Sequence, residues 1–429
     1  MPRLLALVLA CVAPLHAGER LTRTSQERFQ DARFGLFLHW GIYSVLGEGE
    51  WALHRKQMAL TAYAPLADHF NPVRFDAEAW VRTAQEAGMR YITFTAKHHD
   101  GFALWHTGQS RWNVVDGTPL GRDVVRELSQ ACAKAKMPLF LYYSQLDWHH
   151  PDYHPRGWTG QYSGRPDTGN FDRYLDYVDA QLEELLTGYG PIAGIWFDGW
   201  WDRPDADWRL DRTYGLIHRL QPAALVGNNH HRAPKPGEDF QMFEQDLPGQ
   251  NTAGHSPDAV VGALPLETCD TMNRSWGFNR SDSAFKSPRE LIHRLVRAAG
   301  HNANLLLNVG PTPEGEFQPE VTERLRAVGT WLKTAGVSVY GTRGGPVSPR
   351  AWGVSTQTAE HVYLHVLEWQ DRWLAVPGLQ GLSRPRLLQD GKPVRTVEVD
   401  GATVIELPAE VRDPIDTIVV FDRVAPVTR

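Results

Sequence analysis

Cysteine is scarce in this chain: among its 429 residues there are only three, Cys11, Cys132 and Cys269. Cys11 lies in an apolar N-terminal segment. Cys132 falls in a helical pattern and Cys269 in a strand-like one, far apart in the sequence, which indicates two buried free thiols rather than a disulfide. The same scarcity leaves no cysteine cluster that could form a zinc site.

Positive charge is not in excess either. The chain has 44 lysines and arginines against 50 aspartates and glutamates, a formal net charge of -6. Because nucleic acids and anionic membranes are bound mainly through clustered positive charge, we expect neither as a partner. Hydrophobic residues (42%) and charged residues (22%) occur in ordinary globular proportions, and the length allows two or three domains.

Apolar runs long enough to cross a bilayer are absent. Residues 4–12 are almost wholly apolar, follow Arg3 and precede a small residue at Ala17, which is the pattern of a secretory signal peptide over residues 1–17. We therefore expect no membrane span and export to a periplasm or an extracellular space. An alternative is a lipoprotein anchor at Cys11, because this cysteine follows Leu9-Ala10.

From about residue 30 to 340, strand-like runs alternate with helical patterns, which is typical of a parallel sheet built from βα units. The pattern supports seven such units and approaches the eight of a (β/α)-barrel, so a slightly irregular, TIM-like (β/α)-barrel fits it. We assign residues 18–343 to this barrel. The expected strands are 34–38, 91–95, 138–143, 192–197, 224–226, 266–269 and 304–308, and the expected helices are 75–87, 124–135, 171–186, 212–220, 287–299 and 318–335.

The pattern changes in the last part of the chain, residues 344–429. Short runs with period-two alternation replace the helices, and Asp390-Gly391 and Asp400-Gly401 are hairpin turn signals. We expect a small C-terminal antiparallel β-sandwich that packs on the barrel, with strands at 362–366, 394–399, 403–407 and 417–421.

Tryptophan (16) and histidine (18) are abundant, and they gather after the expected barrel strands. The apolar run that begins at Ile192 ends in Phe197-Asp198-Gly199, followed by two tryptophans. Active sites of such barrels are built at the carboxyl ends of the strands, so Asp198 is a candidate catalytic residue. The surrounding aromatic residues favour a sugar substrate, because the apolar face of a pyranose packs on indole.

Carboxylates at barrel strand ends are typical of glycoside hydrolysis. A retaining enzyme needs two carboxyl groups about 5 to 5.5 Å apart, one as the nucleophile and the other as the acid and then the base. Asp198 is the first candidate, and its partner could be Glu238, Glu244 or Glu267. Glu244 is expected in a loop beside apolar groups, which would raise its pKa as a general acid requires.

Pairs of adjacent histidines raise the possibility of a metal site. Neighbouring residues on a strand point to opposite faces, so such a pair rarely binds one ion, and we expect no metal. We expect His39, His98, His99 and His230 to form hydrogen bonds with sugar hydroxyls instead. The sequence has neither a Gly-x-Ser-x-Gly motif nor a Gly-rich phosphate loop, which argues against an esterase or a kinase, and no cofactor is expected.

Six motifs occur in the order found in the α-L-fucosidases of glycoside hydrolase family 29, which residues 25–345 resemble. They are Phe34 to Ser44, Glu50-Trp51, Lys97 to Phe102, Tyr142-Tyr143-Ser144 with Asp147-Trp148, Trp196 to Gly199, and Ser275-Trp276-Gly277.

This resemblance implies a retaining exo-fucosidase with a catalytic barrel and a β-sandwich, acting on fucosylated oligosaccharides or glycoconjugates. Asp198 matches the family's nucleophile. Glu244 matches the acid/base segment, with Glu267 in reserve, although Met242-Phe243 stands where relatives often have Thr-Pro. The positions that match sugar contacts are His39, Glu50, Trp51, His98, His99, Tyr142, Trp196 and Trp276, and His230 lies near a place where many relatives carry arginine.

Two alternative functions remain. Strand-end residues that hold hydroxyls are not unique to fucose, so another retaining exo-glycosidase such as a galactosidase is possible. A catalytically inactive fucose-binding lectin is the other alternative, but a lectin does not need the carboxyl pair of Asp198 and Glu244.

Overall fold

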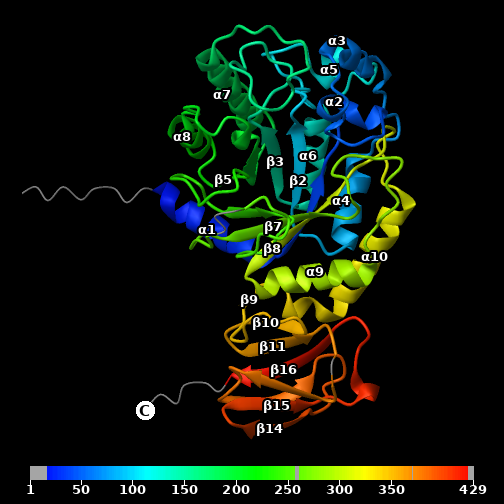
Figure 1. Ribbon diagram of the computed structural model, residues 1–429, viewed down its shortest axis with the longest axis vertical. Coiled ribbons are helices and arrows are strands. Elements are labelled where there is room, and N and C mark those ends of the chain that lie inside the picture. Colours follow the sequence, from blue (N-terminus) through cyan, green and yellow to red (C-terminus); the bar gives the residue numbers. More distant parts are fainter. Residues whose placement is uncertain (1–16, 257–259, 370, 424–429) are drawn as a thin grey trace, which may run out of the picture.

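Eight parallel strands form one sheet that curls into a nearly closed barrel (Figure 1). The computed structural model describes residues 17–256, 260–369 and 371–423. The order in the sheet is β5-β4-β3-β2-β1-β8-β7-β6. The strands are β1 (Phe34–Leu38), β2 (Ile92–Lys97), β3 (Leu139–Ser144), β4 (Gly194–Asp198), β5 (Leu225–Asn228), β6 (Gln241–Glu244), β7 (Leu266–Thr271) and β8 (Ala303–Val309). The predicted barrel is thereby confirmed.

Strand β6 is the element that the sequence pattern did not predict. It has only four residues, it lies in a polar stretch rich in proline and glycine, and Glu244 is its last residue. The expectation that Glu244 lies in a loop is therefore wrong. Pairing with β7 holds these residues extended despite their weak strand pattern, with Glu244 opposite Cys269.

The helices surround the barrel, and most begin at the capping residues that the sequence provides. Asp76, Asp123 and Ser287 accept hydrogen bonds from backbone N–H groups in the first turns of α4, α6 and α9. The longer helices are α1 (Ala17–Ala32), α4 (Ala77–Glu86), α6 (Val124–Ala135), α7 (Phe171–Gly188), α8 (Leu210–Leu220), α9 (Pro288–Gly300) and α10 (Pro319–Ala335). The short helices α2 (Ala52–Arg55), α3 (Leu60–Tyr63) and α5 (Val114–Gly117) lie within connections between strands.

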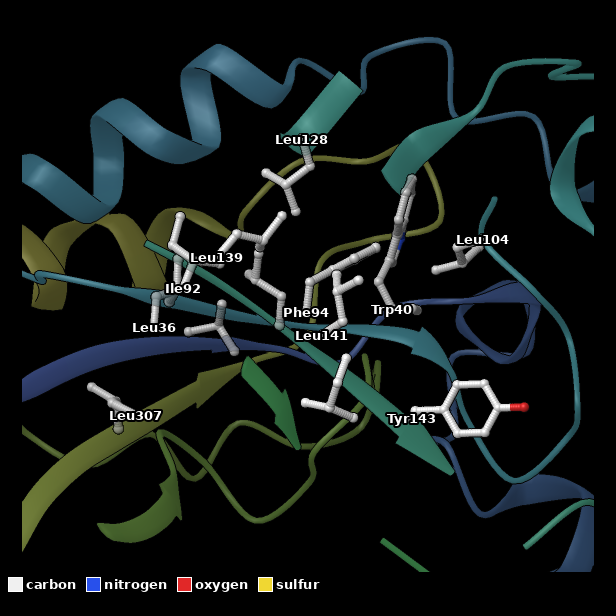
Figure 2. Packing of buried hydrophobic residues seen from close by; sticks show 14 of the residues in the cluster. Leu36, Trp40, Ile92, Phe94, Leu104, Leu128, Leu139, Leu141, Tyr143 and Leu307 are labelled. Carbon is white, nitrogen blue, oxygen red and sulfur yellow. The ribbon is translucent and has the colours of Figure 1, made fainter. Parts of the chain in front are cut away.

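Alternate residues of the strands serve two different cores. Leu36 belongs to the layer between strands and helices, and Figure 2 shows it beside Ile92 and Leu139, with Leu128 of α6 nearby. Its neighbour Phe37 belongs to a separate, mostly aromatic cluster inside the barrel. Because both faces are buried, the strands show near-continuous apolar runs instead of alternation.

The first and last strands of the sheet, β5 and β6, do not form a ladder, and Asp239 bridges the gap between them. Its backbone N–H donates to the carbonyl oxygen of Val226 at 2.7 Å. Its carboxylate accepts from the N–H of Val226 at 2.9 Å and contacts His218 Nε2 at 2.8 Å. The side chain thus supplies an acceptor that a neighbouring strand would otherwise provide.

Beyond α9 and α10, the chain forms two antiparallel sheets with a shared apolar core (Figure 1). The hairpin predicted at Asp400-Gly401 joins β14 and β15, and both residues have positive φ. The strands are β9 (Arg343–Gly344), β10 (Gly353–Gln357), β11 (His361–Val366), β12 (Trp373–Pro377), β13 (Leu382–Leu387), β14 (Arg395–Val399), β15 (Ala402–Glu406) and β16 (Thr417–Arg423).

The sheets pack closely on α9. A Cβ added at Gly300 would lie 2.4 Å from Val354 Cβ, so only glycine permits this approach. Arg297 Nη2 donates to the carbonyl oxygen of Ala351 at 2.7 Å. The predicted boundary between residues 343 and 344 stays a prediction.

Two further expectations from the sequence concern the cysteines and the N-terminus. Cys132 and Cys269 are buried free thiols, as predicted. Except for Ala17, where α1 begins, the predicted signal peptide lies outside the described residues, and so does Cys11. None of the helices that the structure describes is long and apolar enough to cross a membrane.

Replacement of Asp239 by alanine is expected to destabilise the barrel by about 2–3 kcal/mol, because the N–H of Val226 loses its acceptor in a buried position. Asp239→Asn keeps an acceptor oxygen and should cost less. The exposed Asp205→Ala is the control, with an expected change within about 0.5 kcal/mol. Urea unfolding at neutral pH measures all three. Equal stability of Asp239→Ala and the control would contradict the bridging role.

Candidate active site

Asp198 ends strand β4 at the carboxyl end of the barrel. We refer to the polar and aromatic side chains around it as the pocket. The next residue, Gly199, has a φ of 90°, and a Cβ there would lie 2.6 Å from Leu146 Cβ. Glycine therefore allows the chain to turn sharply and leaves the carboxylate at the strand end. This explains the Asp-Gly pair that the sequence places after an apolar run.

Three side chains donate hydrogen bonds to the Asp198 carboxylate. The Tyr142 hydroxyl donates to Oδ2 at 2.9 Å, and Trp201 Nε1 donates to Oδ1 at 2.9 Å. Asn229 Nδ2 lies 3.3 Å from the same Oδ1. Donors on both oxygens fix the orientation of the carboxylate.

Glu244 reaches the same pocket from the end of β6. Asn229 Nδ2 donates to its Oε2 at 2.8 Å, so one amide nitrogen contacts the carboxyl groups of both Asp198 and Glu244. The two acids are therefore close together, as the short carboxyl separation of retaining glycosidases requires. Burial, and then the charge of Asp198, raises the pKa of Glu244 to about 8.

Neutral histidines line the wall of the pocket on the β1, β2 and β3 side. His39 Nδ1 contacts Asn308 Oδ1 at 2.7 Å, and His99 Nδ1 contacts Ser144 Oγ at 2.7 Å. Asn308 donates through its own amide to Trp276 O, and Ser144 donates to Leu146 O. Asn308 Oδ1 and Ser144 Oγ accept from Nδ1 of the two imidazoles, which leaves Nε2 of each ring without a proton. Nε2 of His99 lies 3.6 Å from Asp198 Oδ2.

Burial is the first cause of the neutrality of these rings. It lowers the pKa of His39 and of His99 to about 3 each, and the pKa of His98 is held well below its usual value. His98 stacks on Tyr142 with an interplanar angle of 10°, and its buried Nδ1 has no hydrogen-bond partner among the described residues. A polar ligand would satisfy such an atom.

Aromatic rings and one more acid complete the pocket. Trp51 lies 5.3 Å from His99 and 5.8 Å from Trp201 between ring centroids, and Trp276 lies 5.2 Å from His39. Glu50 accepts from the N–H of Gly277 at 2.7 Å and so ties the loop that carries Trp51 to the loop that carries Trp276. Burial raises the pKa of Glu50.

Trp196 and Glu267 lie below the pocket, inside the barrel. Trp196 stacks with Tyr142 at 5.4 Å between ring centroids, and its Nε1 donates to Glu267 Oε1 at 2.8 Å. The Tyr91 hydroxyl donates to the other oxygen of Glu267 at 2.6 Å. Both oxygens of this acid are thus bound within the protein. Burial raises the pKa of Glu267 to about 7.

His230 and His231 diverge at the end of β5. His230 Nε2 contacts Glu238 Oε1 at 3.0 Å, and its Nδ1 accepts from the N–H of Arg232. Both ring nitrogens of His230 are therefore occupied, and the sugar contact expected of this residue stays a prediction. His231 has a positive φ of 60°, and its Nε2 lies 3.8 Å from Glu244 Oε2.

Three residues of the site were not singled out from the sequence: Asn229, Trp201 and His231. Each follows a barrel strand within a polar or aromatic run that the sequence pattern does reveal. Their specific contacts could not be predicted, because these contacts join the ends of different strands. The distances between the ends of β4, β5 and β6 are set only when the sheet closes into a barrel.

The described residues contain no group of three or more histidine, cysteine, aspartate or glutamate side chains placed to hold a metal ion. A cavity of about 1320 Å³ lies at the opposite end of the barrel, between α1, α4, α6 and α10. It contains neither Asp198 nor Glu244.

Comparisons with known proteins agree with this geometry. A family model described as Alpha-L-fucosidase matches residues 17–337. The chain is similar to the structure of alpha-L-fucosidase isoenzyme 1 from Paenibacillus thiaminolyticus, with 32% identity and a TM-score of 0.83 over 94% of this chain and 100% of that one. It is 28% identical to the plasma alpha-L-fucosidase of Homo sapiens, over 89% of this chain and 85% of that protein.

A further similar structure is a GH29 alpha-L-fucosidase from Bacteroides thetaiotaomicron, trapped as a covalent intermediate in complex with 2-fluoro-fucosyl fluoride. Its identity to this chain is 27% and its TM-score 0.81, with 93% of this chain and 96% of that one covered.

Replacement of Glu267 by glutamine should change how stability depends on pH. The pKa of this group rises from 4.5 to about 7 on folding, so the folded protein holds a proton that the unfolded chain releases between these values. The free energy of unfolding of the wild type should therefore fall by up to about 3 kcal/mol relative to Glu267→Gln as pH rises from 4.5 to 7. Denaturant unfolding across this range measures it, and a constant difference would contradict the assignment.

Proposed function

The chain belongs to the alpha-L-fucosidase family of retaining glycoside hydrolases, and we propose that it releases terminal α-L-fucose from glycans or glycoconjugates with Asp198 as the nucleophile and Glu244 as the general acid and base. The observation that carries this proposal is the contact of one amide, that of Asn229, with both carboxyl groups.

In the first step, an oxygen of Asp198 attacks the anomeric carbon of fucose and the bond to the leaving group breaks. The proton of Glu244 passes to the departing oxygen, and fucose becomes an ester of Asp198. In the second step, Glu244 takes a proton from water, whose oxygen attacks the anomeric carbon and releases Asp198. Two inversions give overall retention.

The environments of the two acids suit these opposite roles. Asp198 accepts hydrogen bonds from three side chains on both of its oxygens, which hold it as a nucleophile must be held, whereas burial raises the pKa of Glu244 to about 8, as a general acid requires. The charge of Asp198 is one cause of this raised pKa and disappears when the fucosyl ester forms. The pKa of Glu244 should then fall, which prepares it to act as a base.

The other glutamates fit the acid/base role less well. Both oxygens of Glu267 are bound by Tyr91 and Trp196 inside the barrel. Glu238 is bound by His230 and Tyr214. Only Glu244 among these three shares a hydrogen-bond donor with Asp198 in the described contacts.

Recognition of fucose falls to the remaining wall of the pocket. His39 and His99 each offer Nε2 as an acceptor, and His98, Tyr142 and Glu50 supply further polar atoms. Trp51 and Trp276 provide apolar surface, and Trp196 supports Tyr142 from below. Acceptors beside aromatic faces suit a sugar that presents hydroxyls on its edges and an apolar face.

Hydrolysis of an aryl α-L-fucoside should fall by about 10² to 10⁴-fold in Glu244→Ala and further in Asp198→Ala, because each loses one half of the mechanism. Azide should rescue both, with α-fucosyl azide from Glu244→Ala and β-fucosyl azide from Asp198→Ala. Product analysis by NMR distinguishes the anomers. Glu267→Ala is the matched control and should give no fucosyl azide.

Each contrary outcome identifies a specific error. Undiminished turnover by purified Asp198→Ala would refute the nucleophile, and azide rescue of Glu267→Ala alone would transfer the acid/base role to Glu267. Binding of fucose without hydrolysis of any fucoside would favour the lectin, and turnover of a galactoside instead would favour the galactosidase.

The pH dependence of kcat/KM should show a basic limb near pH 8, because Glu244 must hold its proton in the free enzyme. The hydrogen bond from Asn229 lowers the pKa of Glu244. Asn229→Ala should therefore move this limb to higher pH as well as reduce kcat. A limb that stays in place, or moves to lower pH, would show that Asn229 does not act on the acid.

A further inference from the structure

An exposed tryptophan lies at the rim of the candidate active site. Trp158, in the loop between β3 and α7, is 58% exposed. Its ring centroid lies 5.5 Å from that of Trp201, and Trp201 Nε1 donates to Asp198 at 2.9 Å. We propose that Trp158 and Trp201 form a second subsite that stacks on the neutral sugar unit next to the fucose. This inference rests on the proposed function.

The loop is built to hold Trp158 in its exposed position. Gly157 and Gly160 flank Trp158-Thr159, and a Cβ at Gly157 would lie 1.8 Å from Asp202 Oδ2. A Cβ at Gly160 would lie 2.2 Å from Trp148 Cδ1, and the φ of Gly160 is 62°. The backbone on both sides of Trp158 is therefore pressed against buried side chains in a way that only glycine permits.

Hydrogen bonds fix the same segment. Asp202 Oδ1 accepts from both the N–H of Thr159 at 2.9 Å and its hydroxyl at 2.8 Å, and Tyr153 donates to Asp202 Oδ2 at 2.8 Å. Trp148 Nε1 donates to the Thr159 hydroxyl at 2.9 Å. With Thr159 anchored inward, the adjacent indole remains at the surface. A platform fixed before binding loses little conformational entropy when a ligand stacks on it.

The aromatic surface is continuous from the pocket to the rim. Trp51 lies against His99 in the pocket and stacks on Trp201 with an interplanar angle of 17°. Trp201 in turn contacts Trp158. A ring placed on Trp158 is thus separated from the nucleophile by one indole, that of Trp201.

The chemistry of the platform indicates the kind of ligand. Indole offers a flat, uncharged face, which suits the apolar face of a pyranose. His54 lies 6.3 Å from Trp158 between ring centroids, and its Nδ1 accepts from the N–H of Gly160 at 3.0 Å. In the neutral ring the proton is therefore on Nε2, a donor for a sugar hydroxyl.

The test compares two substrates that differ only in the leaving group. Fucosyl fluoride has a single atom in place of a sugar, and the second substrate is the fucosylated oligosaccharide that the wild type cleaves fastest in a panel of natural linkages. The measured quantity is kcat/KM for the oligosaccharide divided by kcat/KM for fucosyl fluoride. Trp158→Ala should lower this ratio about tenfold, because it removes one stacking surface. Trp158→Phe keeps a flat ring and should restore most of this ratio.

Trp373→Ala is the matched control, because Trp373 is also an exposed tryptophan (40%) but lies on β12 of the C-terminal sheets. It should leave the ratio as in the wild type, and thermal unfolding should show both alanine variants folded. A ratio for Trp158→Ala within about twofold of the wild type would overturn the subsite, as would a wild type that cleaves only the fluoride. A wild type that cleaves neither substrate would instead refute the proposed function.

Discussion

The electrostatic interaction between Asp198 and Glu244 is the constraint on which the rest of this site depends. Two carboxyl groups that touch one amide in a buried pocket cannot both carry a charge at low cost. Tyr142 and Trp201 donate to Asp198, whereas burial and then the charge of Asp198 raise the pKa of Glu244 to about 8. The barrel contributes the geometry, since β4 and β6 end at the same edge with only β5 between their ends.

Much of this arrangement could be predicted from the sequence, because it follows from local patterns. Apolar runs alternating with helical patterns predicted seven of the strands, and Asp198 stands at the end of the clearest run. The helix expected at 124–135 begins at Val124, directly after the capping residue Asp123. Motifs shared with a known family then related Asp198 and Glu244 to catalysis.

The features of the fold and the site that could not be predicted depend on contacts between segments that are distant in the sequence. Strand β6 has four residues and no alternating pattern, so only pairing with β7 defines it. The role of Asn229 depends on the distance between two strand ends, which no local pattern encodes. The different directions of His230 and His231 also could not be predicted from a local pattern. They arise because Glu238, eight positions later in the chain, binds Nε2 of His230.

The neutral state of the buried histidines and the protonated state of Glu244 both follow from burial of the site. A cationic imidazole at His39, His98 or His99 would stabilise a second carboxylate and lower the pKa of Glu244, so that the acid would lose its proton before catalysis. Burial prevents this, since it lowers the pKa of His39 and His99 to about 3. The same neutral rings retain acceptor nitrogens, which a protonated ring would lack. Burial that keeps the histidines neutral is thus also the condition under which Glu244 can remain an acid near neutral pH.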